Sequence, residues 1–422
     1  MPPEGGGKEE VNAMNELLRR DAEAIVRAAI DAVRPDAAVR RALAQIRAED
    51  DIYLAAAGKA AWQMAAAAVR YLDRSIRRGI VLTKYGHVMG ELLGVICYEA
   101  GHPVPDENSF RGTQEILNMT RGLAPPDTIL FLLSGGGSAL FEKPLIPPEE
   151  LRDITGQLLA CGADIVEMNT IRKRLSAVKG GRFAQLCAPA KVFAIVLSDI
   201  LGDPLDMIAS GPACADRSTC EQALAIAEKY RLRLTPQAKE LLARETPKEL
   251  DNVETRITGS VRELCAAAAS AARELGYEPV ILTDQLCCQA REAGSFLASI
   301  ARSHQGKKLA FLAGGETVVK LTGTGKGGRN QELALSAAAG IDGLDGVLVF
   351  SLGSDGTDGP TDAAGGMVDG QTAALLRDQG LSIHQVLENN DAYHALERVD
   401  GLIFTGPTGT NVNDVAVVLI DG

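Results

Sequence analysis

The chain has 422 residues, enough for two domains that each bury a core of their own. Lys and Arg total 43 against 55 Asp and Glu, and the net charge of −12 disfavours nucleic acid and anionic membrane as partners. No apolar run reaches the ~18–20 residues that cross a bilayer, and the first residues lack the pattern of a secretory signal, so we expect a cytoplasmic protein.

The first part of the chain alternates apolar runs with segments of helical periodicity. We expect a disordered tail at residues 1–10, and then helical spacing from Val11 to Ala48 that breaks at Pro35. Runs without polar alternation predict strands at 51–57, 80–83, 95–98, 128–133 and 192–197. Helices are expected at 60–75, 108–121 and across 148–188. Buried strands joined by helices are typical of a parallel, doubly wound α/β sheet.

The second part repeats this rhythm after a charged, helical stretch at 218–244. The sequence Glu245-Thr246-Pro247 interrupts that stretch, so we place an N-terminal domain at 11–240 and a C-terminal domain at 250–422. Strands are expected at 279–283, 309–313, 317–321, 347–351, 402–404 and 415–420, and helices at 261–275, 289–303, 330–339 and up to about 396. The fold class is therefore two α/β domains.

The eight cysteines include no C-x-x-C pair, and most lie in apolar stretches. We interpret them as buried, reduced thiols, and we do not expect a metal held by His or Cys.

Glycine is the unusual feature of the composition, with 44 residues, and several glycines cluster with polar residues at the ends of predicted strands. The clusters fall at 58–59, 134–138, 179–182, 198–203, 314–316, 323–332, 354–359 and 405–411. Ligands bind at the carboxyl ends of parallel strands, where glycine lets backbone N–H groups approach an anion. Each loop alone could be an ordinary tight turn, but together they predict a binding site.

These loops also carry Lys, Arg, Asp and Glu, the residue types that bind phosphate and Mg²⁺ in phosphoryl transfer. There is no P-loop, because no Ser or Thr follows Gly325-Lys326. The spacing Gly323-x-Gly325-x-x-Gly328 matches a dinucleotide fingerprint, although no residue about 20 positions later is clearly the expected ribose-binding acid, and Asp355 comes later, inside its own glycine-rich turn. A kinase and a dehydrogenase both remain open on this evidence.

Taken together and in order, the motifs resemble the class II glycerate 2-kinase family, with a MOFRL-type C-terminal domain. The resemblance rests on Gly58-Lys59-Ala60, Leu133-Ser134-Gly135-Gly136-Gly137-Ser138, Lys179-Gly180-Gly181-Arg182, Ser198-Asp199-Ile200, Gly327-Gly328-Arg329-Asn330-Gln331-Glu332, Ser354-Asp355-Gly356-Thr357-Asp358-Gly359 and the close at 406–414. It implies transfer of the ATP γ-phosphoryl group to the 2-hydroxyl of D-glycerate, with Mg²⁺. We expect a monomer or homodimer. The resemblance also implies a larger, Rossmann-like N-terminal domain and a smaller C-terminal domain with the site in the cleft between them. The alternative is an NAD(P)-dependent hydroxypyruvate reductase.

The resemblance implies roles for particular residues. Lys59 falls at the position of the family's essential lysine, Arg329 becomes a second catalytic cation, and Asp199 is expected near the glycerate hydroxyl. The competing interpretations are an exposed lysine at a helix start and an arginine that clamps a neighbouring carbonyl. Residues expected to bind substrate or phosphate are Ser134, Gly135, Gly136, Gly137, Ser138, Lys179, Arg182, Gly327, Gly328 and Asn330.

Among these, Lys179 and Arg182 either bind glycerate or pair with acids on the surface. Glu316 and Asp355 are expected near the metal. From the sequence, Asp199, Glu316, Asp355 and Asp358 could each hold Mg²⁺ or accept the substrate proton, because each follows a strand. The alternative for Asp358, and for Asp362, is a cap of a turn or helix.

Overall fold

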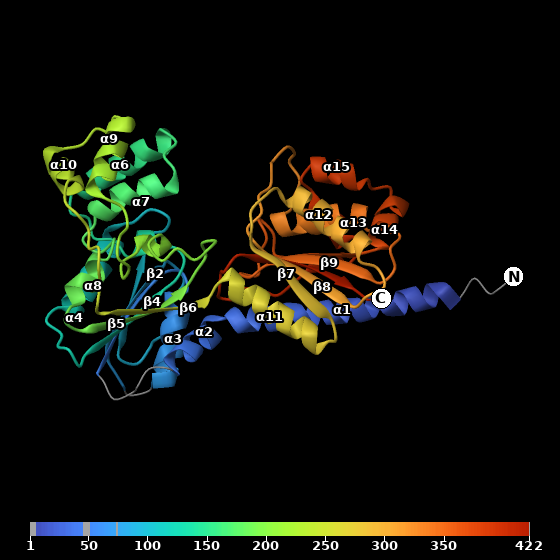
Figure 1. Ribbon diagram of the computed structural model, residues 1–422, viewed down its shortest axis with the longest axis horizontal. Helices are drawn as coiled ribbons and strands as arrows, with labels where there is room; N and C mark the ends of the chain where they lie inside the picture. The colour runs from blue at the N-terminus through green and yellow to red at the C-terminus, as the bar shows by residue number, and fades with distance from the viewer. Residues whose placement is uncertain (1–5, 45–50, 73–74, 422) are drawn as a thin grey trace. The chain divides into compact units, whose positions relative to one another are not determined.

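The computed structural model describes residues 6–44, 51–72 and 75–421, and it separates the chain into two compact units (Figure 1). Pro35–Thr258 form the first, which we call the parallel-sheet unit. Met1–Arg34 and Gly259–Gly422 form the second, the mixed-sheet unit. Each unit is built around a six-stranded sheet, and each is described by itself below.

The parallel-sheet unit has the strand order β3-β2-β1-β4-β5-β6, and neighbouring strands from β1 to β5 run parallel. The strands are β1 (Ile52–Ala57), β2 (Ile76–Lys84), β3 (Val95–Ala100), β4 (Thr128–Leu133), β5 (Lys191–Leu197) and β6 (Val253–Gly259). Parallel strands need crossover connections, and the helices between them provide these.

Helices cover both faces of this sheet, because successive side chains of a strand point to opposite sides. Leu130 and Leu132 of β4 share an apolar cluster with α2 and α3, whereas Ile129 and Phe131 share one with α4 and α8. The helices are α2 (Pro35–Leu43), α3 (Ala61–Leu72), α4 (Glu107–Thr120), α5 (Gly137–Leu140) and α8 (Arg182–Cys187). The prediction of a doubly wound α/β sheet is confirmed.

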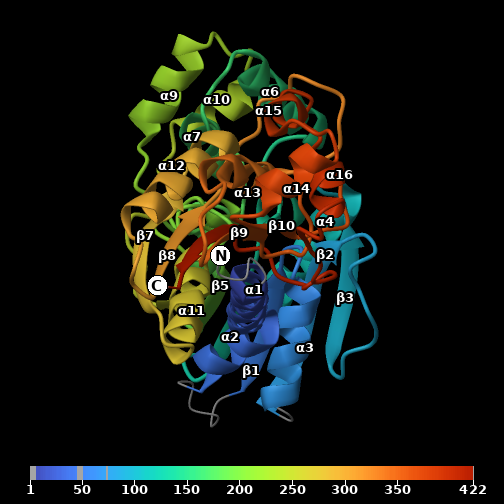
Figure 2. The ribbon, with the colours of Figure 1, turned by 90° about the vertical axis from the view of Figure 1, so that its right-hand side faces the viewer.

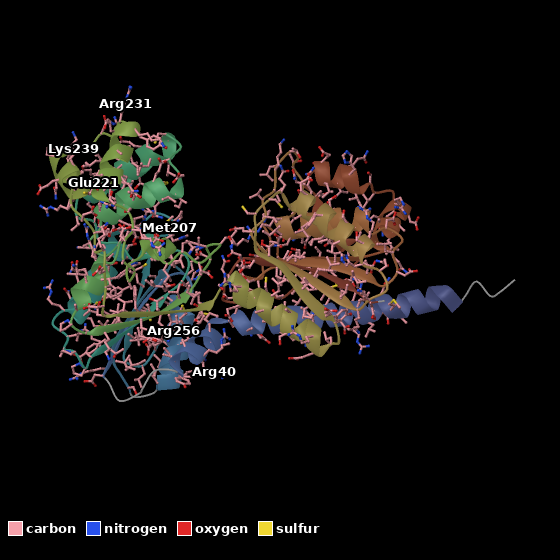
Figure 3. All side chains as sticks on the ribbon, viewed as in Figure 1. Arg40, Met207, Glu221, Arg231, Lys239 and Arg256 are labelled. Carbon is pink, nitrogen blue, oxygen red and sulfur yellow. The ribbon has the colours of Figure 1, made fainter. Side chains whose placement is uncertain are left out.

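The same unit carries a helical subdomain with a small apolar core of its own, including Ile154, Ile171 and Leu242. Its helices are α6 (Pro148–Ala160), α7 (Ile165–Arg174), α9 (Cys220–Lys229) and α10 (Pro236–Leu242). Glu221, Lys239 and other charged side chains cover its outer surface (Figure 3).

The mixed-sheet unit has the strand order β11-β10-β9-β12-β8-β7. The central strand β12 runs antiparallel to both β8 and β9, while β7 and β8 are parallel. The strands are β7 (Glu278–Leu286), β8 (Leu309–Gly315), β9 (Val347–Gly353), β10 (Gly365–Asp369), β11 (Leu402–Ile403) and β12 (Asp414–Ile420). The carboxyl ends of β8 and β9 therefore meet the start of β12 at one edge of the sheet.

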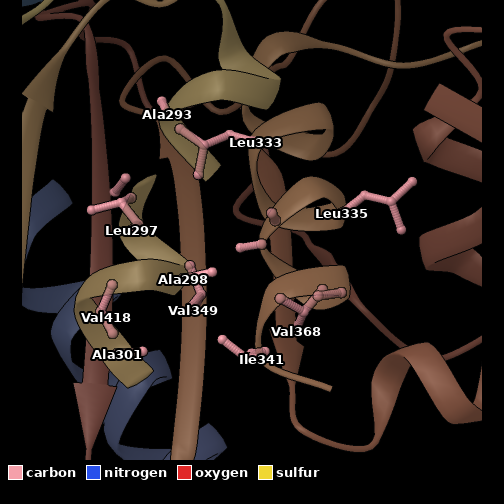
Figure 4. Packing of buried hydrophobic residues seen from close by; sticks show 14 of the residues in the cluster. Ala293, Leu297, Ala298, Ala301, Leu333, Leu335, Ile341, Val349, Val368 and Val418 are labelled. Carbon is pink, nitrogen blue, oxygen red and sulfur yellow. The ribbon is translucent and has the colours of Figure 1, made fainter. Parts of the chain in front are cut away.

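Helices lie on both faces of this sheet too, with α1 and α11 on one face and α12 and α13 on the other (Figure 2). Leu297 of α12, Leu333 of α13 and Val349 of β9 belong to one buried cluster (Figure 4). The helices are α1 (Gly6–Val33), α11 (Val261–Glu274), α12 (Ala290–Ser303), α13 (Arg329–Gly340), α14 (Thr372–Asp378), α15 (Ile383–Glu388) and α16 (Ala392–Glu397).

The domain limits expected from the sequence differ from these units. Helix α1 packs on α11, and Asp21 accepts a hydrogen bond of 2.8 Å from Tyr277, so α1 belongs with the C-terminal part of the chain. Strand β6 extends the parallel sheet beyond residue 240. The expected tail at 1–10 is helical from Gly6, and residues 1–5 lie outside the described part of the chain.

One strand prediction, one helix prediction and the interpretation of the cysteines as buried thiols need correction. The segment 317–321 is not a strand, since only Val318 forms an isolated bridge, and β10 was expected as helix. Of the eight free cysteines, Cys187 and Cys265 are buried, but three are exposed. In the described part of the chain, no helix is long and apolar enough to cross a membrane.

Candidate active site

The loops that follow β1 to β5 all leave the carboxyl edge of the parallel sheet. They bring together side chains that are far apart in the chain: Lys59 after β1, Lys84 and His87 at the end of β2, His102 after β3, Ser134–Ser138 after β4 and Asp199 after β5. This edge is where open α/β sheets bind ligands. Sequence reasoning assigned no site role to Lys84 or His87, and it considered His102, like His394, only as a proton donor for the reductase alternative.

The turns after β1 and β4 fit against each other closely. Lys59 N–H donates to the Gly135 carbonyl over 2.8 Å, and Ala60 N–H donates to Ser134 Oγ over 3.0 Å. Gly58 has a φ of 134°, and a β-carbon there would collide with Ser134. Glycine is therefore needed at position 58 to bring the lysine loop against the glycine-rich loop.

Lys59 is half-buried, and its main chain is well anchored. Its carbonyl accepts hydrogen bonds from Thr83 Oγ1 over 3.3 Å and from His87 Nδ1 over 2.9 Å. Its ammonium, in contrast, has no hydrogen-bond or ion-pair partner in the part of the chain that the structure describes. A positive charge held on a fixed backbone with no protein partner is suited to an anionic ligand.

The glycine-rich turn at Ser134–Ser138 lies against the basic side chains of His102 and Lys59 and against the acidic side chain of Asp199. A β-carbon on Gly136 would lie 2.9 Å from Cδ2 and Nε2 of His102 and 3.2 Å from Cγ of Lys59. A β-carbon on Gly135 would collide with the carboxylate of Asp199. Within the described residues, the N–H groups of Gly135 and Gly136 have no hydrogen-bond acceptor, so they can serve a ligand.

Lys179 stabilises this turn by contacts inside the protein and does not face a ligand. Its side chain is fully buried, its Nζ donates to the Ser138 carbonyl over 2.7 Å, and it pairs with the buried carboxylate of Glu142. Burial lowers the pKa of Lys179 to about 8, against the opposing effect of Glu142. Arg182 donates to the carbonyls of Arg174 and Ser176 over 3.1 and 2.7 Å. These contacts argue against direct substrate binding by Lys179 or Arg182.

Ser138 also has a partner on a strained segment. Its Oγ lies 3.0 Å from Ser210 Oγ, which in turn donates to Asn169 Oδ1 over 3.0 Å. Ala209 and Ser210 both have positive φ, 50° and 61°, a conformation that costs energy for residues other than glycine. This backbone conformation places the Ser210 hydroxyl beside the glycine-rich turn.

In the mixed-sheet unit, Arg329 is the first residue of α13, and carboxylates surround its guanidinium. Nε and NH2 donate to the two oxygens of Asp414 over 2.5 and 3.0 Å, and NH1 donates to Glu316 Oε1 over 2.9 Å. Burial lowers the pKa of Arg329, but Asp414 and Glu316 more than offset this effect and the pKa lies above its usual value. The partners are carboxylates, not the carbonyl of the competing interpretation.

Asp414 is a site residue to which sequence reasoning gave no role. It is the first residue of β12, between Gly315 of β8 and Gly353 of β9, and its side chain is 8% exposed. Burial raises the pKa of Asp414, while Arg329 opposes the shift. Its position follows from the antiparallel central strand, which the pattern of apolar runs does not predict.

Asn330 and Asp358 stabilise the start of α13 by buried hydrogen bonds. Asn330 is buried and its Oδ1 accepts from Ser351 Oγ over 2.6 Å, so the structure argues against a contact with substrate. Asp358 accepts from the N–H groups of Asn330 and Gln331 over 3.2 and 2.8 Å, which confirms its interpretation as a helix cap. Burial raises the pKa of Asp358 to about 6. A β-carbon on Gly328 would collide with this carboxyl group.

The G-x-G-x-x-G spacing does not form a dinucleotide turn. Gly323 begins eight residues after the end of β8, whereas the fingerprint follows its strand directly. Its N–H groups are used within the protein: Gly323 donates to Asn390 Oδ1 over 2.9 Å and Gly325 to the Asn389 carbonyl over 2.8 Å. Gly327 and Gly328 find no such acceptor among the described residues.

The acids expected near a metal lie at the same edge as Arg329. Glu316 has both oxygens engaged, by Arg329 and by Asn413 Nδ2 over 3.1 Å. Asp355 is half-buried, and its Oδ1 accepts from Thr357 N–H over 3.0 Å. Mg²⁺ is commonly held by one or two carboxylates plus substrate phosphates. Asp355 fits this role better than Glu316, which would have to exchange its bond to Arg329.

Comparison with known proteins identifies the family. Residues 21–243 match a domain of unknown function, DUF4147, and residues 309–414 match the MOFRL family. The D-glycerate 2-kinase of Thermotoga maritima is 52% identical over 96% of this chain and 99% of its own length. The chain belongs to the glycerate 2-kinase family. The glycerate 2-kinase of Pyrococcus horikoshii is 42% identical over 87% of each chain.

A solved structure of this glycerate kinase family shares the fold. The crystal structure of glycerate kinase from Thermotoga maritima has a TM-score of 0.93 and 51% identity, and the match covers 96% of this chain and all of that one.

Proposed function

We propose that this protein is an ATP-dependent glycerate 2-kinase, which transfers the γ-phosphoryl group of ATP to the 2-hydroxyl of D-glycerate and forms 2-phosphoglycerate and ADP. The observation that carries the proposal is 52% identity, over nearly the full length of both chains, to a D-glycerate 2-kinase. The cationic groups at the two sheet edges support it, because phosphoryl transfer depends mainly on positioning and charge stabilisation.

In the parallel-sheet unit, Lys59 neutralises a phosphate whose oxygens accept from the N–H groups of Gly135 and Gly136. Asp199, against the other side of the turn, accepts the proton of the attacking 2-hydroxyl. The hydroxyl oxygen then bonds to the γ-phosphorus as the bond to the ADP oxygen breaks. Lys179 acts indirectly, by fixing the Ser138 carbonyl.

In the mixed-sheet unit, Arg329 stabilises negative charge on the transferring phosphoryl group, and Asp414 fixes the plane of its guanidinium. Asp355, with Glu316 as a second ligand, would hold Mg²⁺. When bound, Mg²⁺ screens the charge of the phosphates. Gly327 and Gly328 contribute backbone N–H groups on the same side of α13.

The direct test is to incubate the purified protein with D-glycerate, ATP and Mg²⁺ and to identify the phosphorylated product by ³¹P NMR. A 2-phosphoglycerate signal is expected. A 3-phosphoglycerate signal would keep the kinase and reject the 2-hydroxyl as acceptor. No product with ATP intact would reject the kinase.

A reductase is the alternative that this test should exclude at the same time. Its main sequence support was the G-x-G-x-x-G spacing. In that loop, however, the N–H groups of Gly323 and Gly325 donate hydrogen bonds to other residues of the protein. We therefore expect no oxidation of NADH or NADPH when hydroxypyruvate is added without ATP.

A further inference from the structure

One basic side chain at the edge of the parallel sheet has no role in the proposed function. His102 is the second residue after β3, and its ring lies against Gly136 on the same side as the stem of Lys59. The ring is half-buried. None of the residues that the structure describes gives it a hydrogen bond or an ion pair.

The absence of a partner is informative because neighbouring polar groups are well satisfied. His87 Nδ1 is bonded to the Lys59 carbonyl, and Glu99 accepts from the N–H groups of His87 and Val88, each over 3.0 Å. Asp106, on the same loop as His102, accepts from Tyr85 and from Ser109 N–H. A half-buried imidazole left unpaired among such groups is placed to bond a ligand.

The charged groups that act on His102 are basic. They come from two neighbouring segments: Lys59 after β1, and Lys84 and His87 at the end of β2. Burial, followed by these three groups, lowers the pKa of His102 below its ordinary value of about 6.5. At neutral pH the free protein therefore holds His102 in its neutral form, with one ring N–H available as a donor.

We propose that His102 binds the same anionic group as Lys59, donates a ring N–H to a phosphate or carboxylate oxygen of that group, and takes up a proton as the anion binds. The proposal rests on the proposed function, since it assumes that the edge with Lys59 and Gly136 binds substrate. An anion that settles between Lys59 and His102 offsets the repulsion from the basic neighbours and favours the imidazolium. The affinity for this substrate must then increase as the pH falls.

The test compares the wild type with His102→Ala and His102→Gln in steady-state kinetics from pH 6 to pH 8.5. Glutamine keeps an N–H donor near the position of Nε2 but does not titrate, so it separates the hydrogen bond from the proton. His384→Gln, at an exposed histidine of α15 in the other unit, is the matched control. Circular dichroism and melting temperature check the fold of every variant.

We expect His102→Ala to raise the KM of one substrate by about 10- to 100-fold, as for loss of a hydrogen bond to a charged group. His102→Gln recovers most of this loss at pH 8.5, but its KM does not fall with pH as that of the wild type does. A change in the KM of ATP identifies a phosphate oxygen as the acceptor, and a change in the KM of D-glycerate identifies the carboxylate.

Two results would overturn the proposal, and they can be told apart. If both KM values of His102→Ala stay within twofold of the wild type at every pH while Lys59→Ala is inactive, His102 does not contact substrate and the proposed site stands. If Lys59→Ala keeps its turnover, the edge itself has been assigned wrongly, and the proposal for His102 fails with it.

Discussion

Lys59 and Arg329, the two cations assigned to phosphate, have opposite surroundings in their separate units. Lys59 lies against Gly136 together with His102, and its ammonium has no partner among the described residues. Arg329 is held by Asp414 and Glu316, and three of its N–H groups are already used. The parallel sheet thus offers an open positive charge, whereas the mixed sheet offers a neutralised one whose orientation is fixed.

This difference indicates how each cation contributes. An unpaired ammonium gains most of its stabilisation from the ligand, so its removal harms the ligand-bound states and leaves the folded protein intact. A guanidinium paired with a buried carboxylate also contributes to folding, because its removal leaves Asp414 buried without a counter-charge. Activity and stability should therefore separate at Lys59 and change together at Arg329.

Substitution of Lys59 by alanine is expected to have the largest effect on catalysis. We expect kcat to fall on the order of 10³-fold, the range found when a preorganised electrostatic group is removed from an active site. The melting temperature should stay within about 1 °C, because no described residue depends on the ammonium. Lys239→Ala, at an exposed lysine of α10, is the matched control. A large fall in melting temperature would show that Lys59 is a structural residue.

Substitution of Arg329 by alanine should lower kcat by about 10²- to 10³-fold and also destabilise the protein. The free energy of unfolding should fall by about 1–3 kcal/mol, because the carboxylate of Asp414 loses two hydrogen bonds while it stays buried. Urea denaturation measures this loss, and Arg398→Ala, at an exposed arginine of the same unit, is the control.

Asp414 distinguishes orientation from charge at Arg329. Asp414→Asn keeps the shape and one acceptor but removes the bidentate pairing, so kcat should fall while both KM values change little. Asp414→Glu should restore part of the turnover. Equal losses in the two variants would mean that Asp414 does not act by orienting Arg329.

How much of this arrangement the sequence predicts depends on the sheet. In the parallel unit, strands β1 to β5 all end at the same edge, so the apolar runs at 51–57, 128–133 and 192–197 were enough to bring the loops of Lys59, Ser134–Ser138 and Asp199 together. In the mixed unit the same reasoning missed Asp414, since it begins a strand that runs against its neighbours.

Burial is the other property that residue type and spacing did not predict. Lys179 and Arg182 were expected to face glycerate or surface acids, yet Lys179 is fully buried against Glu142. Helix α1 was placed with the wrong part of the chain because its contacts with α11 and Tyr277 span more than 200 residues. Such long-range contacts depend on tertiary packing, which the residue types and their spacing along the chain do not specify.

The smallest effect is expected at Asp358, a buried acid near Arg329. Its titration should make the free energy of unfolding depend on pH. Burial raises the pKa of Asp358 to about 6, above its value of about 3.9 in an unfolded chain. Between these two values the folded state binds more protons, so the contribution of Asp358 to stability is present at low pH and is lost as the pH rises through 6.

Asp358→Asn cannot lose a proton. Its free energy of unfolding relative to the wild type should therefore rise by about 1–3 kcal/mol from pH 4 to pH 7, above any constant cost of the weaker helix cap. Urea denaturation at several pH values measures this difference, with Asp345→Asn at an exposed site as the control. If the difference in free energy of unfolding between Asp358→Asn and the wild type does not vary with pH, Asp358 is already charged near pH 4. Arg329 would then stabilise the charged form of Asp358 as well as the carboxylates of Asp414 and Glu316, which it contacts directly.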